Sequence, residues 1–149
     1  MALSRSFAEG RARLVRWTLW VVATQTAVAS IRGAAHVSIP VPVASPVDAA
    51  LILGAVYLGP VLGAALLLRS RRALGAQLLA VSYSVALAYG TLSHFALAGP
   101  DNIGSVPGPG WGSLFMITAA SLSVLEGLGL VLASGLLRAS PRAAPPSDA

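Results

Sequence analysis

Four long apolar runs constrain the fold of this chain more than any other feature of the sequence. They cover approximately Leu14–Ala34, Pro46–Leu68, Leu74–Leu97 and Ser113–Leu137. Each run is long enough to cross the hydrocarbon core of a bilayer, which takes roughly 20 residues of α-helix. The sequence therefore predicts an all-α, polytopic integral membrane protein, a four-helix bundle formed by residues 14–138.

The composition supports a membrane protein and argues against nucleic-acid binding. Hydrophobic residues make up 56% of the chain and charged residues only 10%, whereas soluble domains carry about 25% charged residues. The net charge is +5, but the arginines that produce it stand at the ends of apolar runs. They are not interleaved with aromatic residues for stacking on bases, so we expect no nucleic-acid partner. The chain has no cysteine, which excludes disulfides and iron–sulfur clusters.

The arginines also predict how the chain is oriented in its membrane. With four spans, nine of the ten arginines fall on one side and only Arg32 falls on the other. Because arginine-rich loops stay in the cytoplasm, both termini are expected there, in a plasma membrane. Residues 1–13 are then a cytoplasmic N-terminal segment, and residues 139–149 a disordered cytoplasmic tail.

An alternative concerns the first apolar run. A basic leader, an apolar stretch and the small-residue pattern "AVA" at 27–29 are also typical of a secretory signal peptide. Cleavage after Ala29 would leave three spans. The polar face of this run continues past Ala29, which favours an uncleaved first helix.

Local signals mark the second span. Ser45 is the expected N-cap, with Pro46 at the first helical position and Asp48 placed to complete a capping box. Pro60 lies within the span and is expected to kink it. Gly59 and Gly63 form a small-xxx-small pair, which we expect to pack against another helix of the same chain.

Polar residues line up on one face of three of the predicted helices, and such faces turn inward in a membrane bundle. The faces are Thr18, Gln25, Ala29, Arg32 and His36 on the first helix, Gln77, Ser84, Thr91 and His94 on the third, and Ser123, Glu126, Gly129 and Ala133 on the fourth. The spacing predicts a compact bundle with a partly polar interior.

Glu126 is the most informative polar residue because it lies near the middle of the fourth run. An ionised carboxylate there costs about 2.5–3.5 kcal/mol on insertion scales, so Glu126 is expected to be protonated or closely partnered. Gln25 lies at nearly the same depth and is the expected partner, with Tyr83 and Ser84 nearby. This midplane polar site has two interpretations: a structural hydrogen bond between helices, or a carboxylate that carries a proton or binds substrate. A partner subunit could also supply the group opposite Glu126.

A second polar group is predicted near the non-cytoplasmic surface. It consists of Arg32, His36, Asp48, His94 and Asp101. Two histidines on facing helices could bind copper or ligate haem, but no metal-ligand spacing supports this, and we expect no cofactor. The favoured interpretation is an ion pair between Arg32 and Asp48 or Asp101 that closes the outer mouth of the bundle.

The layout resembles that of the DoxX-like group of small four-helix membrane proteins. The resemblance rests on the short basic hairpin "LLLRSRRALGA" between spans two and three and on the proline-containing loop "AGPDNIGSVPGPG" before span four. It implies a four-helix membrane protein. His36 stands where the group typically has lysine, and the resemblance assigns no site residue.

The expected function is that of a non-enzymatic membrane subunit or accessory protein with a polar site around Glu126. One alternative is a small-solute or proton-linked transporter that uses Glu126. Another is a haem- or metal-binding redox subunit that uses His36 and His94. The expected partners are the lipid bilayer and either a second copy of the chain or a larger membrane complex.

Overall fold

The computed structural model describes residues 2–39, 45–69, 71–106 and 108–139, and the regular structure within them is helical. In chain order the elements are α1 (Ala2–Ser38), α2 (Pro46–Leu51), the π-helical segment η1 (Ile52–Leu58), α3 (Gly59–Leu68), α4 (Arg72–Thr91), the π-helical segment η2 (Leu92–Ala96) and α5 (Trp111–Arg138). The segments α2, η1 and α3 follow one another without a break, as do α4 and η2. The predicted all-α fold is confirmed, with four helical stretches long and apolar enough to cross a membrane.

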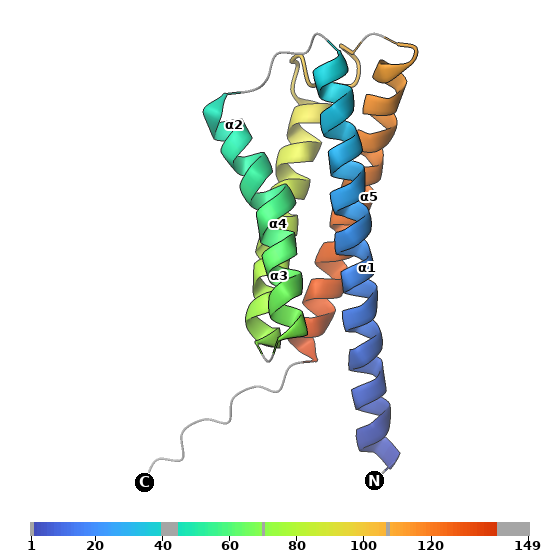
Figure 1. The fold of residues 1–149 in the computed structure, drawn as a ribbon, viewed down its shortest axis with the longest axis vertical. Coiled ribbons are helices and arrows are strands. Elements are labelled where there is room, and N and C mark those ends of the chain that lie inside the picture. The colour runs from blue at the N-terminus through green and yellow to red at the C-terminus, as the bar shows by residue number, and fades with distance from the viewer. Residues whose placement is uncertain (1, 40–44, 70, 107, 140–149) are drawn as a thin grey trace.

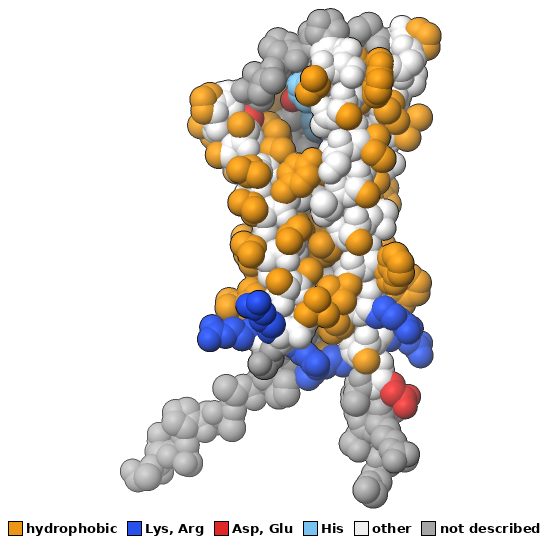
Figure 2. Space-filling model, in the orientation of Figure 1, with side chains coloured by type: hydrophobic (Ala, Val, Ile, Leu, Met, Phe, Trp, Pro, Cys, Tyr) orange, Lys and Arg blue, Asp and Glu red, His pale blue; other side chains and the backbone are white. Residues whose placement is uncertain are grey.

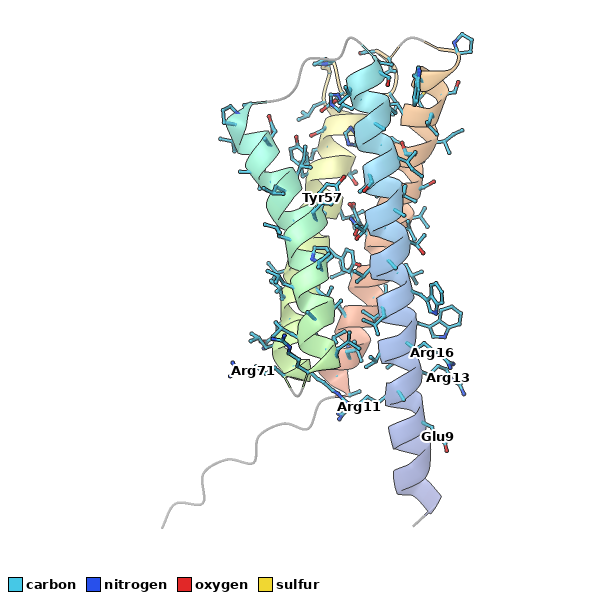
Figure 3. The ribbon with its side chains drawn as sticks, viewed as in Figure 1. Glu9, Arg11, Arg13, Arg16, Tyr57 and Arg71 are labelled. Atoms are coloured by element: carbon cyan, nitrogen blue, oxygen red, sulfur yellow. The ribbon has the colours of Figure 1, made fainter. Side chains whose placement is uncertain are left out.

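The four stretches form an elongated bundle in which α1 packs on α5, α5 on α4, and α4 on α3 (Figure 1). The two ends of the bundle differ in charge (Figures 2 and 3). One end, called here the arginine-rich end, carries Arg11, Arg13 and Arg16 of α1, the arginines between α3 and α4 and at the start of α4, and Arg138 at the end of α5. There Arg11 donates a hydrogen bond to the carbonyl of Ala139, which joins α1 to the end of α5. The opposite end, called here the histidine end, carries His36 and His94.

Glycines allow the second and third spans to pack closely. A Cβ atom added at Gly63 would lie 2.6 Å from Leu79 Cγ, and one added at Gly75 would lie 2.7 Å from the carbonyl oxygen of Gly63. A Cβ at Gly59 would lie 2.0 Å from Ser82 Oγ. Side chains larger than hydrogen therefore do not fit at these positions. The prediction that Gly59 and Gly63 contact another helix of the same chain is confirmed.

The second span bends where Pro60 interrupts its hydrogen bonding. Its start is as predicted: Ser45 and Asp48 form a capping box, with Pro46 in the first turn. The π-helical segment η1 ends immediately before α3, in which Pro60 is the second residue. Because proline has no N–H group, Pro60 cannot donate to the carbonyl of Val56, four residues earlier. Figure 1 shows α2 leaning away from the other helices above this point.

The first and last helices extend beyond the predicted apolar runs, whereas the helical residues 46–68 match the second run. The first helix begins at Ala2 and continues to Ser38, whereas the apolar run covered 14–34. Arg32 and His36 lie on its last turns, in agreement with their place on the predicted polar face of the first helix. Hydropathy ends a predicted run where arginines and other polar residues begin. A helix can continue through such residues, because helix formation does not require apolar side chains. The expected disordered tail falls largely outside the described residues, beyond Ala139.

The predicted polar face of the third span is wrong for three of its four residues. Gln77, Ser84 and Thr91 are exposed on the bundle surface, and only His94 is buried. The buried face of α4 instead contains Gly75, Ala76, Leu79, Ser82, Tyr83 and Ala86. Serine and threonine hydroxyls can bond to a carbonyl of their own helix, so they need no inward position. Thr26 and Ser30 of α1 form such bonds, to Val22 and Thr26.

Candidate functional site

A cavity of about 350 Å³ lies in the histidine-end half of the bundle. Its walls come from α1, α2, η1, α4 and α5, and they are mainly apolar. Val37 of α1 and Leu53 of η1 line it and are exposed, so the cavity opens on the side of the bundle between these two segments. Figure 2 shows this hollow, with histidine and acidic side chains visible inside it.

The cavity follows from the bend in the second span and from small residues on the facing helices. Because α2 leans outward, it is separated from α1, and η1 forms the cavity wall that faces α1. Ala29 and Gly33 on α1, Ala86 and Gly90 on α4, and Ala119 on α5 complete the walls without filling the space. A cavity of this size is at the lower end of the range for small-molecule sites, about 300–1,000 Å³.

Arg32 is the central polar residue of the cavity. The residue is 9% exposed, and its guanidinium group donates to the carbonyl oxygen of Phe115, 3.2 Å away. It also lies 3.9 Å from the centroid of the Phe115 ring, in a cation–π arrangement. Its Nη2 atom is 3.1 Å from His94 Nε2. These contacts fix Arg32 at the cavity wall through neutral groups.

His94 is held between Arg32 and the loop that follows η2. Its Nδ1 atom is 3.0 Å from the carbonyl oxygen of Asp101, to which it donates. That bond leaves Nε2 as the acceptor facing Arg32, so the ring is the neutral tautomer with its proton on Nδ1. The backbone N–H of Ile103 donates to the carbonyl of His94, which keeps this loop against the end of the helix.

The contact at the mouth of the cavity differs from the ion pair that was predicted. His36 Nε2 lies 3.1 Å from Asp101 Oδ1, and the carboxylate of Asp48 accepts bonds from the backbone N–H and hydroxyl of Ser45. The prediction that Arg32 pairs with Asp48 or Asp101 is therefore wrong. Since Arg32 lies one turn deeper than His36 on α1, it reaches Phe115 and His94 instead of the two aspartates.

Glu126 lies in the cavity wall and is 3% exposed. Its carboxyl group is close enough to Arg32 for an electrostatic interaction, but among the described residues the contact within 4 Å between an acidic and a basic side chain joins His36 and Asp101. A Cβ atom added at Gly90 would lie 3.8 Å from both Glu126 Oε2 and His94 Cδ2. Gly90 thus lies in the cavity wall between the carboxyl group of Glu126 and the Arg32–His94 pair.

Gln25 does not bond to Glu126, contrary to the prediction. Its Nε2 atom donates to the carbonyl oxygen of Val56 at 2.9 Å. This is the oxygen to which Pro60, which has no N–H group, cannot donate. Gln25 Oε1 and the hydroxyl of Tyr83 are buried without a hydrogen-bond partner among the described residues. The Tyr83 ring packs on Gly129, where an added Cβ would lie 2.5 Å from the ring. Ser84, the fourth residue of the predicted midplane site, is exposed on α4.

Three aromatic residues of the site were not predicted from the sequence. Phe115 is fully buried and its ring contacts Arg32, His36 and His94. It precedes Glu126 by three helical turns, so it lies on the inward face that Glu126 marked. Tyr57 extends toward α1 (Figure 3), close to Gly33, and Tyr89 interacts with Asp48 and Ser93. Tyr57 and Tyr89 both line the cavity.

The two histidines were also considered as metal or haem ligands. Both ring nitrogens of His94 already face partners, Asp101 and Arg32, and Nε2 of His36 faces Asp101. Within the described parts of the chain, no three metal-ligating side chains gather. What the site offers chemically is a mainly apolar cavity whose walls hold one buried cation, two carboxyl groups, two imidazoles and two phenol groups: Arg32, Asp101, Glu126, His36, His94, Tyr57 and Tyr89.

Comparison of the chain with protein-family models, with curated proteins and with solved structures gives no match.

Proposed function

We propose that this chain is a small integral membrane protein that binds a small amphiphilic molecule in the cavity at its histidine end. The observation that carries the proposal is the cavity itself. It combines mainly apolar walls with a few convergent polar groups, above all Arg32 and Glu126. Sites for small organic molecules have this composition, because apolar walls provide affinity and the few polar groups fix orientation.

The position of the opening supports entry from the membrane. The exposed residues that flank it, Val37 and Leu53, are apolar. In a membrane-inserted bundle the gap between α1 and η1 faces hydrocarbon, so a lipid-soluble molecule could enter sideways without crossing water. The arginine-rich end then lies in the cytoplasm, and the cavity lies in the opposite leaflet.

The proposal is tested by identifying small molecules that copurify with the protein. Wild type, Gly90→Ala and Gly90→Leu are purified in mild detergent, and their organic extracts are compared by mass spectrometry. An alanine Cβ at position 90 has ordinary contacts, so Gly90→Ala should retain the ligand. The longer leucine side chain extends between Glu126 and His94, so Gly90→Leu should lose it.

A species retained at stoichiometric amounts by wild type and Gly90→Ala, and lost from a folded Gly90→Leu, supports a binding site. Identical extracts from all three proteins, each as stable as wild type, contradict it. The proposed ligand occupies the polar site that was expected around Glu126. The proposed site lies closer to the histidine end than the position of Glu126 alone predicted. The accessory-subunit role, the transporter alternative, the redox alternative, the absence of enzymatic activity and the DoxX-like resemblance stay predictions.

A further inference from the structure

The charge of Arg32 points to the chemistry of the ligand. Asp101 and Glu126 are close enough to interact with its charge, but among the described residues no carboxylate lies within ion-pair distance of its guanidinium group, since Asp101 contacts His36 instead. Its hydrogen-bonding partners are a backbone carbonyl and a neutral imidazole. A buried cation without an anion in contact is costly, and the cost falls when an anion binds beside it.

Arg32 and Glu126 differ in how they can respond to burial. A glutamate becomes neutral by taking up a proton, whereas an arginine in a protein keeps its charge. Of the two groups, only Arg32 therefore carries an obligatory charge into the cavity. A guanidinium group has five N–H donors, and the contacts of Arg32 to Phe115 and His94 engage two of its nitrogens.

We infer that the cavity binds a membrane-soluble carboxylic acid, whose carboxylate accepts hydrogen bonds from Arg32. The inference rests on the proposed function and specifies its ligand. A guanidinium–carboxylate pair is one of the strongest hydrogen-bonded pairs in proteins, and it is stronger still away from water. Of the two acidic residues that line the cavity, Asp101 contacts His36 at the mouth. Glu126 lies deeper and is then in its neutral acid form, since a negative charge there would repel the ligand.

The remaining walls fit the tail of such a molecule. Ile52, Val56 and Leu122 present apolar surface in the cavity, and the opening between Val37 and Leu53 leads toward hydrocarbon. A ligand of about 350 Å³ or less fits inside, and a longer tail can extend through the opening. The occupant is thus a short-chain or medium-chain alkyl acid or the head of a longer one.

The first test compares three ligands of matched tail on the wild-type protein in lipid nanodiscs at pH 7. Decanoate is the anion, decanol the neutral analogue and decylamine the cation, because alkanoic acids and alkylamines ionise near the reference values of Glu and Lys. Affinity is measured by isothermal titration calorimetry. Decanoate should bind at least about tenfold more tightly than decanol, a difference that one charge-assisted hydrogen bond accounts for. Decylamine should not bind measurably.

The second test uses variants of the two charged residues. Arg32→Met should weaken decanoate binding about tenfold or more, and Arg32→Lys should weaken it less, because the charge remains without the planar fork. Glu126→Gln keeps a neutral group of the same shape and should bind decanoate at least as tightly as wild type. If Arg32→Met does not fold, the ligand series on wild type and on Glu126→Gln still decides the question.

The outcomes separate this inference from the proposed function. Equal binding of decanol and decanoate, with loss in Gly90→Leu, keeps the binding cavity and overturns the carboxylic acid. Preferential binding of decylamine that Glu126→Gln abolishes also overturns it, since the site then recognises a cation. Absence of binding by all three ligands, together with identical extracts from wild type and Gly90→Leu, contradicts both proposals.

Discussion

Gln25 and Pro60 belong to one hydrogen-bonding arrangement, although they lie on different helices. Pro60 leaves the carbonyl of Val56 without the donor that a continuous helix would provide, and Gln25 Nε2 donates to that oxygen at 2.9 Å. In the membrane-inserted bundle that we propose, an unbonded carbonyl costs several kcal/mol, roughly the penalty for exposing a backbone group to hydrocarbon. The buried glutamine thus stabilises the bend that shapes the cavity.

A double-mutant cycle tests this arrangement. Gln25→Leu should lower the free energy of unfolding in detergent by about 0.6–2 kcal/mol, the range for a hydrogen bond between membrane helices. In a Pro60→Ala background the N–H group of the new alanine can donate to the carbonyl of Val56. Gln25→Leu should therefore lower the free energy of unfolding by less in that background. Equal costs in both backgrounds would show that Gln25 and Pro60 act independently.

The identity of most polar site residues could be predicted from the sequence, but not their partners. Helical spacing placed Gln25, Arg32 and Glu126 on inward faces, and all three are buried. Which groups touch depends on how far each helix is rotated and bent, and that is set by contacts between helices. The hydrogen bond from Gln25 to Val56 could be predicted only if the bend at Pro60 was already known. Phe115 is apolar, so no pattern of polar residues in the sequence marked it as part of the site.

At the scale of elements, glycines decide how closely the second and third spans approach. The contacts of Gly63 and Gly75 leave no room for a side chain, and part of that contact is backbone against backbone. Backbone cannot move aside as a flexible side chain can. Few residues separate the end of α3 from the start of α4, which keeps the glycines in register. Sequence spacing predicted this close contact for Gly59 and Gly63 because small residues spaced by four share a helix face.

Replacement of single glycines by alanine tests this packing. Gly75→Ala should reduce stability by about 1–3 kcal/mol, as expected for overpacking. Gly127→Ala is the matched control, since an added Cβ there meets nothing within 4 Å. That change should leave stability unchanged or raise it by up to about 1 kcal/mol, because alanine favours the helix. Equal thermal stability of the two variants in detergent would argue against the packing.

At the scale of the whole molecule, charge and cavity lie at opposite ends of the bundle (Figure 2). The arginine-rich end carries exposed basic side chains, and the histidine end holds the cavity with its buried polar groups. The four long apolar helices could be predicted from hydropathy alone. The cavity could not, because it arises from the lean of α2 and from small residues contributed by several helices.

The predicted orientation can be tested by labelling single cysteines, because the chain has none of its own. Ala73 at the arginine-rich end and Ser105 at the histidine end are both exposed. In intact cells a membrane-impermeant maleimide should label Ser105→Cys and not Ala73→Cys. Permeabilised cells provide the control in which both react. The reverse pattern would place the cavity in the cytoplasmic leaflet.

The central claim, that the cavity holds a small amphiphile, is tested most directly by photolabelling. A decanoic acid that carries a diazirine in its tail is irradiated with the protein in nanodiscs, and the adducts are located by peptide mass spectrometry. We predict adducts on cavity residues such as Ile52, Val56 and Leu122, with loss of labelling when excess decanoate competes. Adducts on the outward-facing Val81, Val124 and Val131 instead, insensitive to competition, would contradict the account.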